Sequence, residues 1–121
     1  MIIEIPFKTP TINKLYWHRG NIKIMKTEAK NLKLKIKAIV AQLEPNIDYL
    51  AQNKLKITVE IHEDWYYKNG EIARKDISNR EKFLTDAVFD ALGIDDKIIF
   101  ENTYKKVQSD QEKAVIEILV I

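Results

Sequence analysis

The stretch KLKITVEIH, residues 54–62, decides the fold because it is the clearest β-strand pattern in the chain. Its apolar residues alternate with polar ones and would share one face of a strand, namely Leu55, Ile57, Val59 and Ile61. A strand with one apolar face needs a covering layer, and the segments on either side of it must supply that layer.

Two helices are predicted, one before and one after this strand. Apolar residues keep helical spacing from 27 to 43, although residues 32–37 alone alternate like a strand; the length and the lack of a breaker before Pro45 favour a helix. A second apolar arc follows Ser78 and ends at Gly93. The sequence Ser78-Asn79-Arg80-Glu81 matches a capping box, with Ser78 as N-cap and Glu81 reaching back to it.

Shorter segments complete the expected fold. Residues 2–7 predict an edge strand, and residues 9–26 predict a hairpin or turn around Arg19-Gly20-Asn21. Residues 63–75, with a turn at Asn69-Gly70, predict a protruding loop or a loose hairpin. Residues 97–108 and 113–121 look like two strands forming an antiparallel pair. We therefore expect an α+β fold, a mixed sheet with helices packed on it, in one domain over 1–121.

Composition narrows the classes of function. The chain has no cysteine, which excludes disulfides, thiolate metal sites and a cysteine nucleophile. Neither a signal peptide nor an apolar run of ~18 residues is evident, so we expect a cytoplasmic protein with no membrane partner. Residues 1–40 carry a net charge of +7 and the remaining 81 residues −5. This asymmetry fits either a polyanion ligand or a solvated lysine-rich face.

Carboxylates flank the second predicted helix. Asp76 precedes it, and Asp95 and Asp96 follow it. About fourteen helical residues separate these ends by roughly 20 Å, so the acids could meet only if an extended segment runs back alongside the helix. The alternative is that Asp76 is only a turn residue before the helix, and that Asp95 and Asp96 are exposed acids after it.

These residues resemble the RusA-type Holliday junction endodeoxyribonucleases. That family carries Asp-x-Asp-Asn-x-x-Lys leading into a helix and an Asp-Asp pair after it, as in residues 76–82 and Asp95-Asp96 here, with Asp86 one turn beyond Lys82. Its amino-terminal Pro-x-x-Asn-x-x-Tyr and basic, glycine-containing turn correspond to residues 10–20, including Asn13. The two motifs have the right order and spacing over most of the chain.

One position departs from the family pattern. The second aspartate of the motif is Ser78 in this chain. Loss of that acid leaves either a site with fewer metal ligands or a protein that binds junctions without cutting them, and we favour retained activity.

The resemblance implies a dimeric enzyme that hydrolyses four-way DNA junctions with Mg²⁺, for which Mn²⁺ is a possible substitute. Phosphodiester cleavage suits Mg²⁺ bound by hard oxygen ligands. We expect Asp76 and Asp96 to be ligands, and Asp95 a ligand or its supporting neighbour. Lys82 would face the scissile phosphate; the alternative is a surface lysine paired with Asp86, worth about 0.3 kcal/mol. Support would come from Asn13, Ser78, Asn79 and Asp86.

Basic and aromatic residues are candidates for binding the DNA. The expected phosphate contacts are Lys14, Arg19, Lys23, Lys26, Arg74 and Lys75. The aromatic residues Trp65, Tyr66 and Tyr67 would either stack on unpaired bases or pack against the core or a partner subunit. Paired nicks in a two-fold symmetric junction imply a homodimer.

Overall fold

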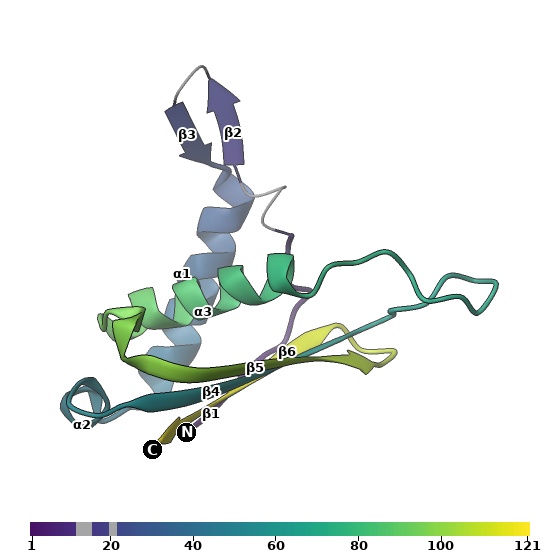
Figure 1. The fold of residues 1–121 in the computed structure, drawn as a ribbon. Helices are drawn as coiled ribbons and strands as arrows, with labels where there is room; N and C mark the ends of the chain where they lie inside the picture. Colours follow the sequence, from purple (N-terminus) through teal and green to yellow (C-terminus); the bar gives the residue numbers. More distant parts are fainter. Residues whose placement is uncertain (12–15, 20–21) are drawn as a thin grey trace.

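The computed structural model describes the backbone of residues 1–11, 16–19 and 22–121, and the side chains of residues 1–11 and 25–121. Its main sheet has four strands in the order β1-β6-β4-β5. These are β1 (Ile2–Ile5), β4 (Leu55–Glu63), β5 (Ile99–Gln108) and β6 (Lys113–Val120). Because β5 is parallel to β4 while β6 is antiparallel to both β4 and β1, the predicted mixed sheet is confirmed (Figure 1).

The predicted pairing of the last two strands is wrong, because β4 lies between β5 and β6. The short connection crosses the end of β4, where the Ser109 N–H donates to the Glu63 carbonyl at 3.1 Å. Burial explains this order. β6 buries Ala114, Ile116 and Ile118 and takes an inner position, whereas most of β5 is exposed and it forms an edge.

Two helices cover one face of the sheet, α1 (Thr27–Gln42) and α3 (Ser78–Leu92) (Figure 1). Both predicted helices are thus confirmed. They belong to one buried core with the predicted face of β4, whose Leu55, Ile57 and Val59 are fully buried. The Lys33 ammonium of α1 lies 2.9 Å from the Asp90 carboxylate of α3. A short helix, α2 (Ile47–Ala51), was not predicted.

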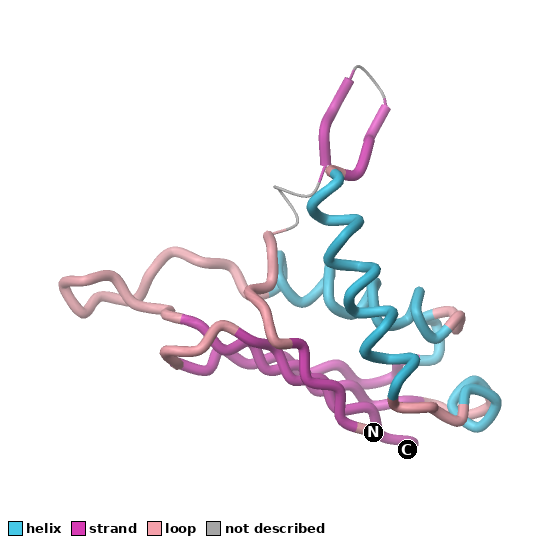
Figure 2. Tube along the Cα trace, turned by 180° about the vertical axis from the view of Figure 1, so that it is seen from behind, coloured by secondary structure: helices cyan, strands magenta, loops and turns pink. Residues whose placement is uncertain are grey.

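Two hairpins extend from this body (Figure 2). β2 (Tyr16–Arg19) and β3 (Ile22–Met25) pair antiparallel beside the start of α1, as the sequence predicts. Residues 64–75, which we call the arm, form the predicted loose hairpin, with a bridge between Tyr66 and Ile72. Gly70 has φ +86° in the turn of the arm, a conformation that favours glycine.

The three aromatic residues of the arm differ in role. Trp65 is 3% exposed, and its indole N–H donates to the Ile61 carbonyl at 3.1 Å, so it belongs to the core. Tyr66 and Tyr67 are exposed. Of the two alternatives for these residues, core packing is confirmed for Trp65.

Within the described parts of the chain, no helix is long and apolar enough to span a membrane.

Candidate active site

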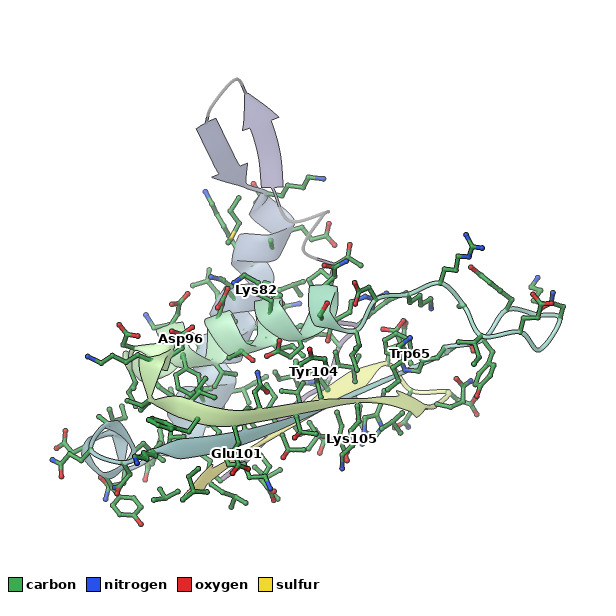
Figure 3. All side chains as sticks on the ribbon, viewed as in Figure 1. Trp65, Lys82, Asp96, Glu101, Tyr104 and Lys105 are labelled. Carbon is green, nitrogen blue, oxygen red and sulfur yellow. The ribbon has the colours of Figure 1, made fainter. Side chains whose placement is uncertain are left out.

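A groove of about 590 Å³ runs between α3 and the start of β5. Lys82 and Asp86 line it from α3, Asn102 from β5, and Asp96 from the connection between the two elements. Figure 3 shows Lys82 on α3 and Asp96 at the turn where the chain leaves this helix for β5. The groove is therefore lined by residues that precede Gly93 in the sequence and by residues that follow it.

The chain reverses after α3 because Gly93 adopts the left-handed conformation, with φ +69°. A short 3-10 helix, η2 (Asp96–Ile98), follows. The Asp95 carboxylate caps it by accepting the Lys97 N–H at 2.9 Å. Asp95 thus stabilises the turn, and Asp96 lines the groove.

The Asp96 carboxylate lies close enough to Asp86 to affect the charge of Asp86. Burial raises the pKa of Asp86, the Lys82 and Lys33 ammonium groups oppose this shift, and the negative charges of Asp96 and Asp90 add to it. The Lys82 ammonium is exposed and makes no ion pair or hydrogen bond with any described residue. The groove therefore sets a free cation beside two carboxylates.

The sequence of the chain matches the model of a protein family described as endodeoxyribonuclease RusA over residues 6–119. The chain belongs to the RusA endodeoxyribonuclease family. This confirms the resemblance inferred from the two motifs. A comparison with curated proteins finds no match.

Asp76, the first acid of the RusA motif, lies at the start of α3 and does not line the groove. One of its carboxylate oxygens accepts the Ser78 N–H at 3.1 Å and the Ser78 hydroxyl at 2.8 Å. The predicted capping box is therefore wrong, because Asp76 takes over the capping of the Ser78 N–H and Ser78 is itself the first residue of the helix.

The three acids proposed as metal ligands are not brought together within one chain. Among the described residues, no three His, Cys, Asp or Glu side chains form a group that could hold a metal ion, and Asp76, Asp95 and Asp96 are all described. The pair formed by Asp86 and Asp96 is the part of the carboxylate arrangement that the fold does assemble. Asp86 thus has a more central position than the sequence indicated.

Glu81 is a groove residue that the sequence analysis misassigned to the capping box. Its side chain is 8% exposed, and one carboxylate oxygen accepts hydrogen bonds from the Thr85 hydroxyl and, at 2.8 Å, from the Asn102 amide. It therefore joins α3 to β5 along the groove. Helical spacing could have predicted that Glu81 is buried. Glu81 precedes Leu84 and Thr85 by three and four residues, which places it on the same buried face of the helix.

The predicted DNA contacts, and the predicted supporting residues Asn13 and Asn79, fall in different environments. Asn13 and Lys14 lie outside the described residues, and only the backbone is described for Arg19 in β2 and Lys23 in β3. Lys26 immediately precedes α1 and already has an interaction partner. Arg74 is exposed on the returning half of the arm, and half-buried Asn79 lines the groove.

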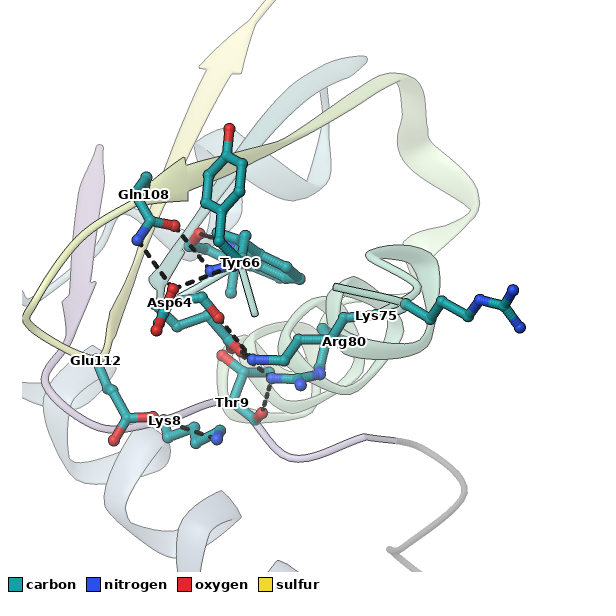
Figure 4. Close-up of polar contacts among 12 residues, drawn as sticks. Lys8, Thr9, Asp64, Tyr66, Lys75, Arg80, Gln108 and Glu112 are labelled. Atoms are coloured by element: carbon teal, nitrogen blue, oxygen red, sulfur yellow. Dashed lines mark hydrogen bonds and ion pairs between the residues drawn. The ribbon is translucent and has the colours of Figure 1, made fainter. Parts of the chain in front are cut away.

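Lys75 points inward at the base of the arm. Its ammonium donates to the Glu63 carboxylate at 3.1 Å and to the Asp64 carbonyl at 2.6 Å. Glu63 also pairs with Arg80 of α3, whose guanidinium donates to the Thr9 carbonyl at 2.9 Å (Figure 4). Lys75 thus helps to fasten the arm to α3, which leaves Arg74 as the more accessible cation.

Proposed function

We propose that this chain is a Mg²⁺-dependent, structure-selective endonuclease that resolves four-way DNA junctions in the cytoplasm. The observation that carries the proposal is the match to the RusA endodeoxyribonuclease family over residues 6–119, nearly the whole chain. The groove supports it, because it combines carboxylates with an unpaired ammonium group.

Lys82 is the residue best suited to act on the phosphate. Its ammonium is exposed at the groove, so a backbone phosphate could approach it directly. Phosphodiester hydrolysis builds negative charge on the phosphoryl oxygens, and a preorganised cation offsets that charge where it develops. Lys82 would therefore stabilise the transition state more than it strengthens binding.

The donor chemistry of the groove fits a hard divalent cation. The side-chain oxygen ligands available in the groove are carboxylates, amides and hydroxyls, and the chain contains no thiol. We assign Asp96 and Asp86 as the residues that would hold the ion, with Asp95 positioning the turn. Bound Mg²⁺ supplies activation of water and neutralisation of charge. Asp76 stays a proposed ligand. It does not line the groove, but its carboxylate accepts the hydroxyl of Ser78, which does.

A non-catalytic junction-binding protein is the main alternative, because Ser78 replaces the second acid of the family motif. Ser78 lines the groove and is held by Asp76, so this end of the groove offers a hydroxyl where the motif has a carboxylate. A nuclease for flaps or other branched DNA is a second alternative.

We also propose a homodimer, because two strands of one junction must be cut.

The test uses a labelled synthetic four-way junction, a matched flap and linear duplex, each incubated with the protein in Mg²⁺ or EDTA. We expect paired, symmetric nicks in the junction that require Mg²⁺. In Lys82→Met the nicks should disappear while the gel shift of the junction persists. Lys35→Met, an exposed change on α1, is the matched control and should nick normally.

Each alternative gives a different result in this experiment. A tight junction shift without nicks in the wild type would identify a binding protein. Faster cleavage of the flap than of the junction would identify a flap nuclease. Nicking by Lys82→Met at the wild-type rate would remove Lys82 from the mechanism.

A further inference from the structure

A second cavity, which we call the pocket, lies between α1, α3 and the segment that follows β1. Arg80 lines it from α3, Glu28 and Ala29 line it from the first turn of α1, and Lys8 and Thr9 line it from the intervening segment. Figure 4 shows Arg80 beside Thr9 and Lys8. The volume is about 350 Å³, and none of the described lining residues belongs to the groove. The proposed cleavage therefore makes no use of this pocket.

Two buried polar atoms in the lining lack a partner. Thr9 is 1% exposed and Arg80 is 5% exposed, yet the Thr9 hydroxyl oxygen and the Arg80 Nε make no hydrogen bond with any described residue. Buried polar groups without a partner are costly and rare in folded proteins. Because the Nε–H of arginine can only donate, a ligand that completes the pocket must supply an acceptor oxygen.

The charges behind the pocket favour an anion. Arg80 and Lys75 share the single buried carboxylate of Glu63, which leaves an excess of positive charge in this cluster. Lys8 adds an ammonium group, which the Glu112 carboxylate at 3.3 Å partly offsets. An acceptor that is also negatively charged would therefore be held more strongly than a neutral one.

The first turn of α1 adds backbone donors. Lys26 at the N-cap makes no side-chain cap hydrogen bond to this sixteen-residue helix. The first N–H groups of a helix have no partner within the helix, and its N-terminus attracts anions. Among the described lining residues, Glu28 is the one acid that opposes an anion, and it is exposed to solvent.

We propose that the pocket binds a phosphate oxyanion, to which the Thr9 hydroxyl and the Arg80 Nε–H donate. A phosphate offers several acceptor oxygens on one centre, so it could satisfy both side chains and the first turn of α1 together. Free phosphate and a phosphate group of DNA share this chemistry. The DNA source rests on the proposed function, whereas the site itself can be tested without DNA.

Inorganic phosphate is the probe for the site. In a thermal shift titration, it should raise the melting temperature of the wild type more than sodium chloride of equal ionic strength does. Thr9→Val has nearly the same shape without the hydroxyl and should weaken the apparent phosphate affinity roughly tenfold, whereas Thr9→Ser should retain it. General salt stabilisation by phosphate would be equal in all three proteins.

The melting temperature without phosphate shows whether Thr9→Val folds. This variant should melt no lower than the wild type in phosphate-free buffer, because it removes a buried hydroxyl that has no partner. A loss of phosphate response in a protein of unchanged stability therefore reports on the ligand.

Glu28→Gln tests the sign of the ligand's charge. Removing this carboxylate from the lining should tighten phosphate binding by a factor of about two to five, whereas it would weaken the binding of a cation. Glu44→Gln makes the same change of net charge beyond the other end of α1 and should leave the affinity unchanged.

Junction binding in EDTA identifies the source of the phosphate. If DNA supplies it, inorganic phosphate should compete with the junction at constant ionic strength, and Thr9→Val should weaken the gel shift. If free phosphate is the ligand, Thr9→Val should bind the junction like the wild type and still lose its response to phosphate.

The inference would be overturned by a wild type that does not respond to phosphate, or by an equal response in the wild type and Thr9→Val. The second result would mean that ordinary water satisfies the two buried atoms. A wild type that binds phosphate through Thr9 but cleaves no DNA would refute the proposed function and leave this site intact.

Discussion

At the scale of single residues, the polar network of Glu81 gives the groove its shape. Glu81 accepts hydrogen bonds from Thr85 of its own helix and from Asn102 of β5, in a largely buried position. A buried acceptor with two donors is costly to remove, because its buried donor, the Thr85 hydroxyl, then loses its partner away from water. The side chain therefore holds the two walls of the groove together.

Glu81→Ala should lower the free energy of unfolding by about 1–3 kcal/mol. Glu81→Gln keeps an acceptor oxygen for both donors and should lose less. Urea unfolding followed by circular dichroism measures both changes, and Lys82→Ala, next to it but exposed, serves as the control. Equal stability of the Ala and Gln variants would show that the hydrogen bonds contribute nothing.

Asp86 gives a prediction about pH. Its pKa is raised in the folded protein by burial, which outweighs the opposing ammonium groups, so its ionised form is disfavoured by folding. The penalty is present above the folded pKa and is lost as the pH falls through it. In EDTA, Asp86→Asn should be more thermostable than the wild type at pH 7, and the difference should disappear toward pH 4.

Melting temperatures of both proteins across this pH range test the prediction. A wild type that is more stable than Asp86→Asn at pH 7 would contradict it. Mg²⁺ should then stabilise the wild type and have little effect on Asp86→Asn, because the ion would relieve the same penalty that the substitution removes.

At the scale of elements, Glu63 connects the end of β4, the arm and α3. It is 1% exposed and pairs with both Arg80 and Lys75. Both of these cations also lie within 6 Å of the Trp65 ring, at 5.7 and 5.8 Å from its centroid. A buried charge left without its partner is strongly destabilising, so this cluster fixes the direction in which the arm leaves the body.

Glu63→Gln should therefore lower the free energy of unfolding by about 3–5 kcal/mol, because it leaves the Arg80 guanidinium buried and unpaired. Lys75→Met should cost much less, since Arg80 still neutralises Glu63. Chemical denaturation gives both values. A loss below about 1 kcal/mol in Glu63→Gln would mean that the ion cluster is dispensable.

At the scale of the whole molecule, the sequence predicts elements better than it predicts their neighbours. Period-2 alternation located β4 and helical spacing located α1 and α3, because each pattern reflects one buried face. The pairing of β5 with β6 failed because proximity in sequence favours a hairpin. The weaker apolar pattern of β5, whose residues are mostly exposed, was the signal that it belongs at an edge.

For the candidate site too, the sequence predicts individual residues better than it predicts which residues lie close together. The motif residues Lys82 and Asp96 could be read from the sequence, but the approach of Asp86 and Asp96 depends on the reversal after Gly93. The competition between Ser78 and Asp76 for capping was hidden because both are good acceptors at a helix start. Hydrogen-bond partners such as Asn102 come from distant segments, which local patterns cannot bring together.

The central claim is that the groove between α3 and β5 carries out cleavage, and the single-turnover rate of junction nicking by Asp96→Asn tests it most directly. With saturating protein and Mg²⁺, the rate should fall by a factor on the order of 10²–10³. Asp110→Asn, an exposed change in the turn before β6, should cleave at the wild-type rate. If Asp96→Asn nicks the junction as fast as the wild type, the groove is not the active site.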